Sequence, residues 1–162
     1  MALRPPNSSN LFERVLAFAC IGLTGMTLVA LARGRAEWSL LPSAVWLHLG
    51  AVLIALVLTP VLLLRRRGDA RHRLLGWIWA IAMLVTALST VQVRMIDPGN
   101  FSLIHILSLV VLVTVPLLVW HARTHRVADH RRGARNIVTF ALLVAGFFTF
   151  PFNRLLGHWL LG

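Results

Sequence analysis

The sequence is poor in acidic residues and in cysteine. It holds five Asp and Glu against sixteen basic residues, and only 13% of its 162 residues are charged. A soluble domain of this size has about a quarter of its residues charged. The single cysteine, Cys20, excludes a disulfide framework, and its place in an apolar segment predicts a packing role.

The few carboxylates lie near the ends of the apolar segments or between them, never deep inside one. They are Glu13, Glu37, Asp69, Asp97 and Asp129. A proton-coupled transporter usually keeps an acidic relay within the membrane. The sequence also lacks a nucleotide-binding P-loop, a nucleophile elbow and an HExxH metalloprotease motif. These absences argue against pumps and hydrolases.

Long apolar segments dominate what is present. Hydrophobic residues make up 58% of the chain, and the mean hydropathy is +0.79. About 20 apolar residues cross the hydrocarbon core as a helix, and a backbone in lipid must satisfy its own hydrogen bonds. We therefore predict an all-α integral membrane protein, a single transmembrane domain over residues 1–162. Its five transmembrane helices are expected at about residues 15–32, 44–64, 74–93, 101–120 and 137–152.

The two ends of the chain each allow two interpretations. The residues ALA (30–32) resemble a signal-peptidase site, but the apolar segment before them is longer than the roughly 7–15 residues of a signal peptide. A retained helix is therefore favoured. The apolar tail RLLGHWLLG (154–162) is expected to lie in the membrane interface.

The arginines predict the orientation. The formal net charge is +11, and arginines crowd into two stretches, 65–73 and 121–135, each between two apolar segments. Such loops are typical of the cytoplasmic side and face anionic lipid headgroups. We expect a multi-pass protein of a bacterial inner membrane, with its N-terminus cytoplasmic and its C-terminus outside. Membrane lipid is the expected partner and nucleic acid is not, because the arginines flank apolar segments rather than cover one face of a domain.

Two segments of the chain share a pattern of rare residues. His48 precedes His72 by 24 positions, and His105 precedes His130 by 25; a proline, Pro60 or Pro116, and an arginine stretch lie in between. Such parallel repeats predict two hairpins related by a pseudo-two-fold axis along the membrane normal. The last four helices would then form a haem-type four-helix bundle.

The four histidines fall at two depths in this arrangement. His48 and His105 enter their helices from the outer side, about 6 Å inside the edge, and His72 and His130 stand at the cytoplasmic end. Facing helices of a bundle build such sites, and neutral histidine is an axial ligand of haem iron. The pattern predicts two haem b groups, each held by two histidines. Small residues beside the histidines, Gly76, Ala51, Ser108, Gly133 and Ala134, permit a flat macrocycle and equally permit close helix packing.

Other interpretations of the histidines stay open. An intramembrane histidine can instead hydrogen-bond two helices together, and the cytoplasmic pair can serve as interfacial cations or helix caps. His121 and His125 have the i,i+4 spacing of a divalent-metal pair, although a solvated pair is favoured, and His158 is expected at the interface. In the outer loop, Arg94 and Asp97 would either meet a substrate or form a salt-bridged turn.

Three segments carry a family resemblance. LIHILSL (103–109), ADHRRGAR (128–135) and FFTFPFNRLLG (147–157) resemble bacterial membrane proteins of domain-of-unknown-function family 2306, over residues 40–162. The chain departs from that pattern at residues 133–134 and 152–153. The family name implies no activity. The helix pairing is similar to that of the two-haem, ascorbate-linked cytochromes b, which implies an outer haem on His48 and His105 and an inner haem on His72 and His130.

The leading hypothesis is therefore a b-type cytochrome that passes electrons across the membrane between a donor and a quinone or other redox partner. The alternative is a cofactor-free accessory or assembly subunit whose histidines bond helices together. A metal-ion site or permease that uses His121 and His125 is a third.

Overall fold

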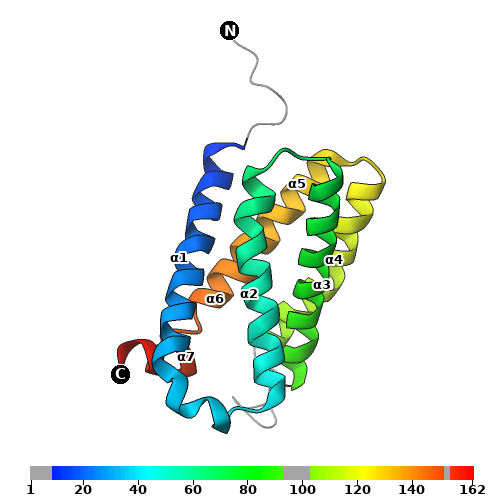
Figure 1. Ribbon diagram of the computed structural model, residues 1–162. Coiled ribbons are helices and arrows are strands. Elements are labelled where there is room, and N and C mark those ends of the chain that lie inside the picture. The colour runs from blue at the N-terminus through cyan, green and yellow to red at the C-terminus, as the bar shows by residue number, and fades with distance from the viewer. Residues whose placement is uncertain (1–8, 93–102, 152–153) are drawn as a thin grey trace.

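The computed structural model describes residues 9–92, 103–151 and 154–162, without the side chains of residues 91, 92 and 103–105. Within these ranges every regular element is helical (Figure 1). The elements are α1 (Leu11–Arg33), the 3₁₀ helix η1 (Gly34–Leu40), α2 (Ser43–Leu64), α3 (Ala70–Gln92), α4 (Leu103–Arg123), α5 (Val127–Asn136), the π-helix η2 (Ile137–Val144), α6 (Ala145–Phe147) and α7 (Leu155–Leu161). The prediction of an all-α protein is confirmed.

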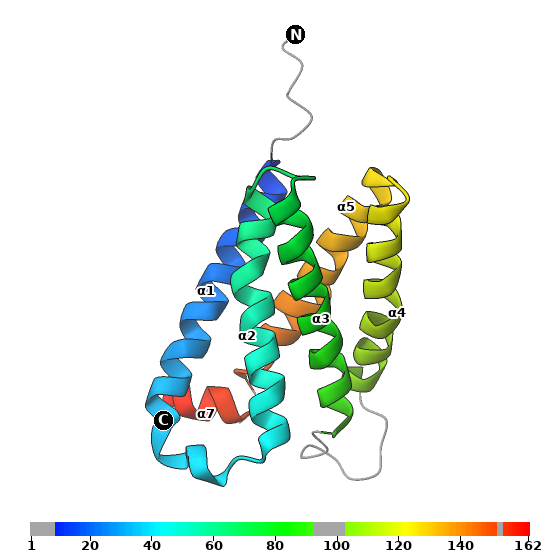
Figure 2. The same ribbon diagram turned by 45° about the vertical axis from the view of Figure 1, so that its right-hand side comes forward.

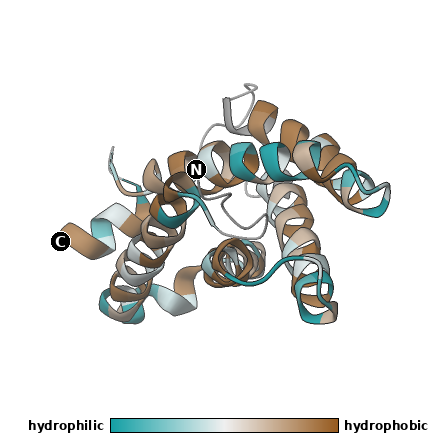
Figure 3. Cartoon of the chain, turned by 90° about the horizontal axis from the view of Figure 1, so that it is seen from above, coloured by the Kyte–Doolittle hydropathy of each residue, from teal (hydrophilic) through white to brown (hydrophobic). Residues whose placement is uncertain are grey.

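Among the described residues, four helical segments are long and apolar enough to cross a membrane. They correspond to α1, α2, α3 and α4. Their outward faces expose large apolar side chains such as Phe18, Ile81 and Val113, which are 67%, 55% and 61% exposed. Seen from above, hydrophobic residues dominate these helices, and hydrophilic residues gather in the connections (Figure 3). The exposure of so much contiguous apolar surface to water is unfavourable, whereas contact with lipid is favourable. These helices therefore indicate a membrane protein.

The first four helices pack in chain order. α1 contacts α2, α2 contacts α3, and α3 contacts α4. The continuous segment from α5 through η2 to α6 then runs diagonally back from α4 toward α1 (Figure 2). Because η2 contacts α1, α2 and α4, the helices α2 and α4 each have α3 on one side and η2 on the other. Cys20, on α1, is fully buried in the core, as its predicted packing role requires.

The fifth predicted span differs most from its expectation. The apolar stretch from Ile137 to Phe147 is preceded by the polar helix α5 and is helical for only eleven residues. At 1.5 Å per residue it rises about 16 Å, well short of the roughly 30 Å hydrocarbon core. Its π-helical turns are a geometry that proteins use rarely and often near functional sites. A fifth complete span therefore stays a prediction.

The C-terminal helix α7 closes the end of the bundle that holds η1. Trp159 is 5% exposed, and its indole Nε1 donates to Glu37 Oε2 at 3.0 Å. Arg33 donates to the carbonyl of Leu160 at 2.5 Å, and the ring of Trp159 fills the space in which a Cβ on Gly34 would lie. The tail predicted to lie in the interface is thus anchored on α1.

Replacing Gly34 with alanine should displace α7. The new methyl group would overlap the Trp159 ring, which cannot shift without losing its bond to Glu37. We expect a lower melting temperature and a red-shifted tryptophan emission. Gly22→Ala is the matched control, since a Cβ at Gly22 meets nothing within 4 Å and alanine favours the helix by about 1 kcal/mol. Equal melting temperatures for the two variants would contradict this account of the docking.

Candidate functional site

Both arginine-rich connections lie at the same end of the bundle. The first turn of α1, the connection from α2 to α3 and the connection from α4 to α5 meet there (Figure 1), and we call this the inner end. Direct contacts show the proximity, because Arg67 of the first connection and Arg131 of α5 both bond to Glu13 of α1. Both stretches therefore lie at one end of the bundle, and the cytoplasmic placement of that end stays a prediction.

Glu13 is the central group of the inner end. Its side chain is 1% exposed and forms ion pairs with Arg67 at 2.6 Å, Arg131 at 2.6 Å and Arg135 at 3.0 Å. Its oxygens are also part of a capping box, in which Asn10 and Glu13 bond to each other's backbone N–H groups at 3.0 and 3.1 Å. One carboxylate thus starts α1 and joins it to two other segments of the chain.

The geometry at Glu13 is that of arginine forks. Arg131 donates from Nε to Oε1 at 2.6 Å and from Nη2 to Oε2 at 2.9 Å, and Arg135 donates twice to Oε1. Two-point bonding of this kind is what the planar guanidinium does best. The carboxylate in turn raises the pKa of Arg131 above its ordinary value. Because a lone carboxylate without water is very unfavourable, the three cations are what allow Glu13 to be buried.

Sequence reasoning missed this cluster. It placed Glu13 at a helix end and assigned it no role. The one local signal was Asn10 followed three residues later by Glu13, the spacing of a capping box. The three arginines follow Glu13 by 54 to 122 positions, and no local pattern connects them.

Asp69 positions the start of α3, which carries His72. Its Oδ1 accepts from the backbone N–H of His72 at 2.6 Å, and its Oδ2 forms an ion pair with Arg65 at 2.8 Å. The Arg65 guanidinium, and then the His72 N–H, lower the pKa of Asp69 to about 2. An ionised cap at a helix N-terminus is favoured by the helix dipole, so α3 begins at a fixed residue.

The inner histidines, His72 and His130, both lie at the inner end of the bundle. They lie within electrostatic range of each other, at the end where α3 and α5 begin. Nδ1 of His130 bonds to the carbonyl of Leu118 on α4 at 3.0 Å, and since a carbonyl only accepts, this nitrogen carries the hydrogen. In the neutral form of His130, the lone pair is then on Nε2. Nδ1 of His72 is buried and has no hydrogen-bond partner among the described residues.

His48 connects α2 to α3. Its Nδ1 lies 3.2 Å from the carbonyl of Thr86, 3.1 Å from Ser89 Oγ and 3.3 Å from Thr90 Oγ1. Ser89 and Thr90 donate their own hydrogens to carbonyls of α3, so all three oxygens can accept from Nδ1–H. The neutral form of His48 therefore has its lone pair on Nε2, the same tautomer as the neutral form of His130.

The partner predicted for His48 lies outside the described residues. The backbone of α4 includes position 105, but the side chain of His105 is not described, and Arg94 and Asp97 fall in the range 93–102. The outer pair and the predicted docking residues of the outer loop therefore stay predictions.

The disfavoured alternative of a helical metal pair at His121 and His125 does not fit the geometry. α4 ends at Arg123, and His125 adopts a φ of +58° in the turn that follows, so the two side chains share no helix face. Asp129 instead pairs with Arg126 at 2.9 Å, and the His121 ring lies against Trp120. Within the described ranges, no group of three or more His, Cys, Asp or Glu side chains is placed to hold a metal ion. His158 is exposed on α7, and its place at the membrane interface stays a prediction.

The small residues near the inner histidines have different uses. A Cβ on Gly76, one turn beyond His72, would meet nothing within 4 Å. A Cβ on Gly133 would meet Leu118 at 3.1 Å, so Gly133 serves the close packing of α5 on α4. The open space next to the inner pair is therefore on the α3 side.

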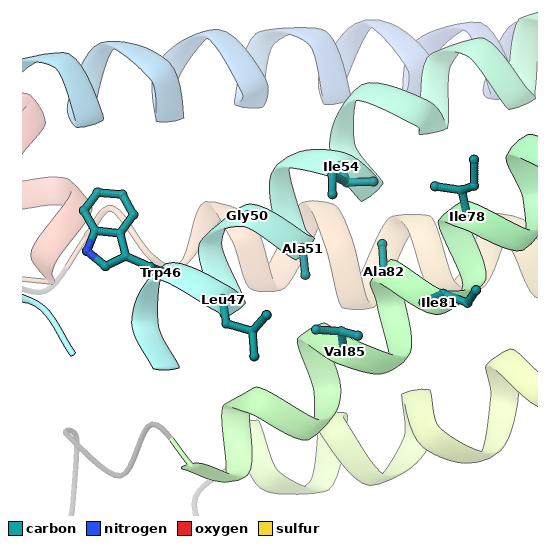
Figure 4. Close-up of a pocket in the computed structure, with 9 residues that line it drawn as sticks. All are labelled: Trp46, Leu47, Gly50, Ala51, Ile54, Ile78, Ile81, Ala82 and Val85. Atoms are coloured by element: carbon teal, nitrogen blue, oxygen red, sulfur yellow. The ribbon is translucent and has the colours of Figure 1, made fainter. Parts of the chain in front are cut away.

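A groove of about 450 Å³ between α2 and α3 is separate from the histidines (Figure 4). It is lined by Trp46, Leu47, Gly50, Ala51, Ile54, Ile78, Ile81, Ala82 and Val85. None of these nine residues is charged or a histidine. The groove therefore suits a hydrocarbon chain and offers no ligand to a metal.

Replacing Glu13 with glutamine should destabilise the protein. Glutamine keeps the hydrogen-bonding shape of the capping box but leaves three guanidinium groups without a counter-charge. We expect a loss of about 3 kcal/mol, at the low end for a broken buried pair because the arginines remain 20–30% exposed. Chemical unfolding in detergent measures it. Asp129→Asn breaks the exposed pair with Arg126 and should change the unfolding free energy by less than about 1 kcal/mol. Similar losses in both variants would contradict a special role of Glu13.

The contribution of Asp69 should depend on pH. Its pKa is about 2 when folded and about 4 in an unfolded chain. The ionised form therefore stabilises the folded state above pH 4, and this stabilisation is lost as the pH falls toward 2. Asp69→Asn keeps the cap acceptor without the charge. The difference in melting temperature between wild type and this variant should be largest near neutral pH and should vanish at low pH. A difference that does not change with pH would refute the role of the ion pair.

Comparison with known protein families, with curated proteins and with solved structures finds no match to this chain. The resemblance to family 2306 and the likeness to two-haem cytochromes b therefore stay predictions.

Proposed function

We propose that the protein is a small b-type membrane cytochrome that carries electrons across a bacterial inner membrane. The observation that supports this best is the inner histidine pair. His72 and His130 lie at the inner end within electrostatic range of each other; Nδ1 of His72 is buried without a hydrogen-bond partner among the described residues, and Nδ1 of His130 is oriented by the carbonyl of Leu118.

The chemistry of these rings fits haem iron. A histidine that binds a metal through one nitrogen typically donates its other N–H to a carbonyl, which fixes its orientation and raises its basicity. His130 does so with Leu118, and His48 does so with Thr86. The unpartnered Nδ1 of His72 is a buried polar atom that a ligand would satisfy. His72 and His130 would hold an inner haem b, and His48 and His105 an outer one.

Haem supplies reversible one-electron transfer when it is bound. The chain's own residues orient the imidazoles, through Leu118 and Thr86, and exclude water through the apolar core of the bundle. Positive charge beside a redox centre favours the state with one more electron, so Arg67 and Arg131 would raise the inner potential. The electron donor would lie on one side of the membrane, and a quinone or another redox partner would accept on the other.

A second candidate function is supported by the same hydrogen bonds. His48 ties α2 to α3 and His130 ties α5 to α4 without any metal, as polar side chains do between helices in lipid. The protein would then be a cofactor-free accessory or assembly subunit.

An absorption spectrum before and after dithionite separates the two functions. We expect protein purified after expression with a haem supply to show a sharp α band and a shifted Soret band on reduction. A pyridine haemochrome assay should count two haems per chain. A protein that stays colourless after reconstitution with haem would refute the cytochrome proposal.

Single substitutions assign the ligands. His130→Ala should remove the inner haem, and His105→Ala should remove the outer one and leave the inner. His121→Ala is the control, because the His121 ring lies against Trp120 and His121 is not one of the four proposed ligands. If His130→Ala lowers stability and leaves the haem content unchanged, His130 is a hydrogen-bonding residue instead.

A further inference from the structure

The inner end carries far more positive charge than its own carboxylates balance. The described residues there include eleven arginines, namely Arg14, Arg65, Arg66, Arg67, Arg71, Arg73, Arg123, Arg126, Arg131, Arg132 and Arg135, and three carboxylates, Glu13, Asp69 and Asp129. The formal surplus is eight positive charges. Asp69 and Asp129 each neutralise one nearby arginine, but Glu13 is shared by three, so its cluster retains two uncompensated charges.

Two guanidinium groups of this cluster, those of Arg67 and Arg135, each have a nitrogen outside the described bonds. The described bonds of Arg67 are all made by Nη2, to Glu13 and to the carbonyl of Leu63. Those of Arg135 are made by Nε and Nη2, to Glu13 alone. In both side chains Nη1 therefore lies outside the described bonds. The side chains of Arg67 and Arg135 are 20% and 26% exposed, so they remain within reach of a ligand at the surface.

The position of the cluster indicates what that ligand is. Glu13 is in the first turn of α1, and Arg67 follows the end of α2 by three residues, so both lie where two membrane-spanning helices leave the apolar layer. Lipid headgroups occupy this level. Every basic residue in the sequence is arginine, and its planar fork matches the oxygens of a phosphate as well as those of a carboxylate.

We propose that Arg67 and Arg135, held in place by Glu13, form a binding site for a phosphate group, supplied by the headgroup of an anionic phospholipid. Glu13 draws the two arginines from distant segments to one point, and both side chains stay partly exposed there. The site is independent of the haem proposal, since it uses none of the histidines.

A lipid titration tests the site. Purified wild-type protein in neutral detergent is titrated with phosphatidylglycerol, phosphatidylcholine or inorganic phosphate at fixed ionic strength, and bound ligand is counted by native mass spectrometry. We expect phosphatidylglycerol to bind more tightly than phosphatidylcholine. Arg67→Gln and Arg135→Gln should each weaken the binding of phosphatidylglycerol by about tenfold, the value of one lost hydrogen bond to a charged group. Each variant leaves Glu13 paired with two arginines.

Arg66→Gln and Arg132→Gln are the matched controls. They remove the same charge from the same two segments, but both residues are exposed, and neither bonds to Glu13 in the described contacts. Their affinities should equal that of wild type. If all four variants bind phosphatidylglycerol equally weakly, the attraction is a diffuse effect of surface charge and the site is overturned. The site is also overturned if the two lipids bind equally well and inorganic phosphate does not bind. If inorganic phosphate binds and depends on Arg67 and Arg135, the site is supported and its ligand is the soluble ion.

If either glutamine variant fails to fold, the corresponding lysine variant keeps the charge opposite Glu13 and removes the fork. Arg135→Lys should then lower the affinity for the phosphate ligand, and Arg132→Lys should not. Equal affinities of the two variants would overturn the site.

Discussion

The buried carboxylate of Glu13 is the interaction on which the inner end of this protein depends. It accepts from Arg67, Arg131 and Arg135, and so fixes α1 against the connection before α3 and against α5. A carboxylate that is 1% exposed stays ionised only while these cations surround it. Each of the two segments so held also carries an inner histidine: His72 follows Arg67 by five residues, and His130 directly precedes Arg131.

Elsewhere the bundle relies on a few specific hydrogen bonds between apolar helices. Lipid is as apolar as the helix faces, so hydrophobic burial gives little preference for one helix pairing over another. Polar contacts supply that preference. Trp79 of α3 donates to Thr59 of α2 at 2.9 Å, His48 of α2 bonds to α3, and His130 of α5 bonds to α4. These bonds set the register of the helices that the proposed haems would lie between.

The same bonds explain why two functions fit the histidines. A ring that donates Nδ1–H to a carbonyl is both a stable interhelical contact and a ligand with its Nε2 lone pair exposed to a metal. The contact at Nδ1 therefore does not distinguish the two. The buried nitrogen of His72 without a described partner is the feature that favours a ligand, since a purely structural histidine would be expected to find an acceptor.

The sequence by itself determined that the chain is helical, that four segments are long and apolar enough to cross a membrane, and that its arginine stretches share one end. These are local properties, because each depends on the composition of one segment of about 20 residues. Even the approach of His72 to His130 follows from the alternating direction of successive helices. The sequence did not predict how the fifth apolar segment is built. Its polar start in α5 packs against α4, and the π-helical turns of η2 pack against α1, α2 and α4.

Only the tertiary structure decided which charges meet and which histidine nitrogen is free. Glu13 and Arg135 are 122 positions apart, as are Glu37 and Trp159, and no sequence spacing relates them. The tautomers of His48 and His130 are set by carbonyls of neighbouring helices, which every residue possesses and no sequence pattern marks. The i,i+4 spacing of His121 and His125 carries no structural meaning for the converse reason: a helical spacing places two side chains on one face only where the helix continues, and α4 ends between them.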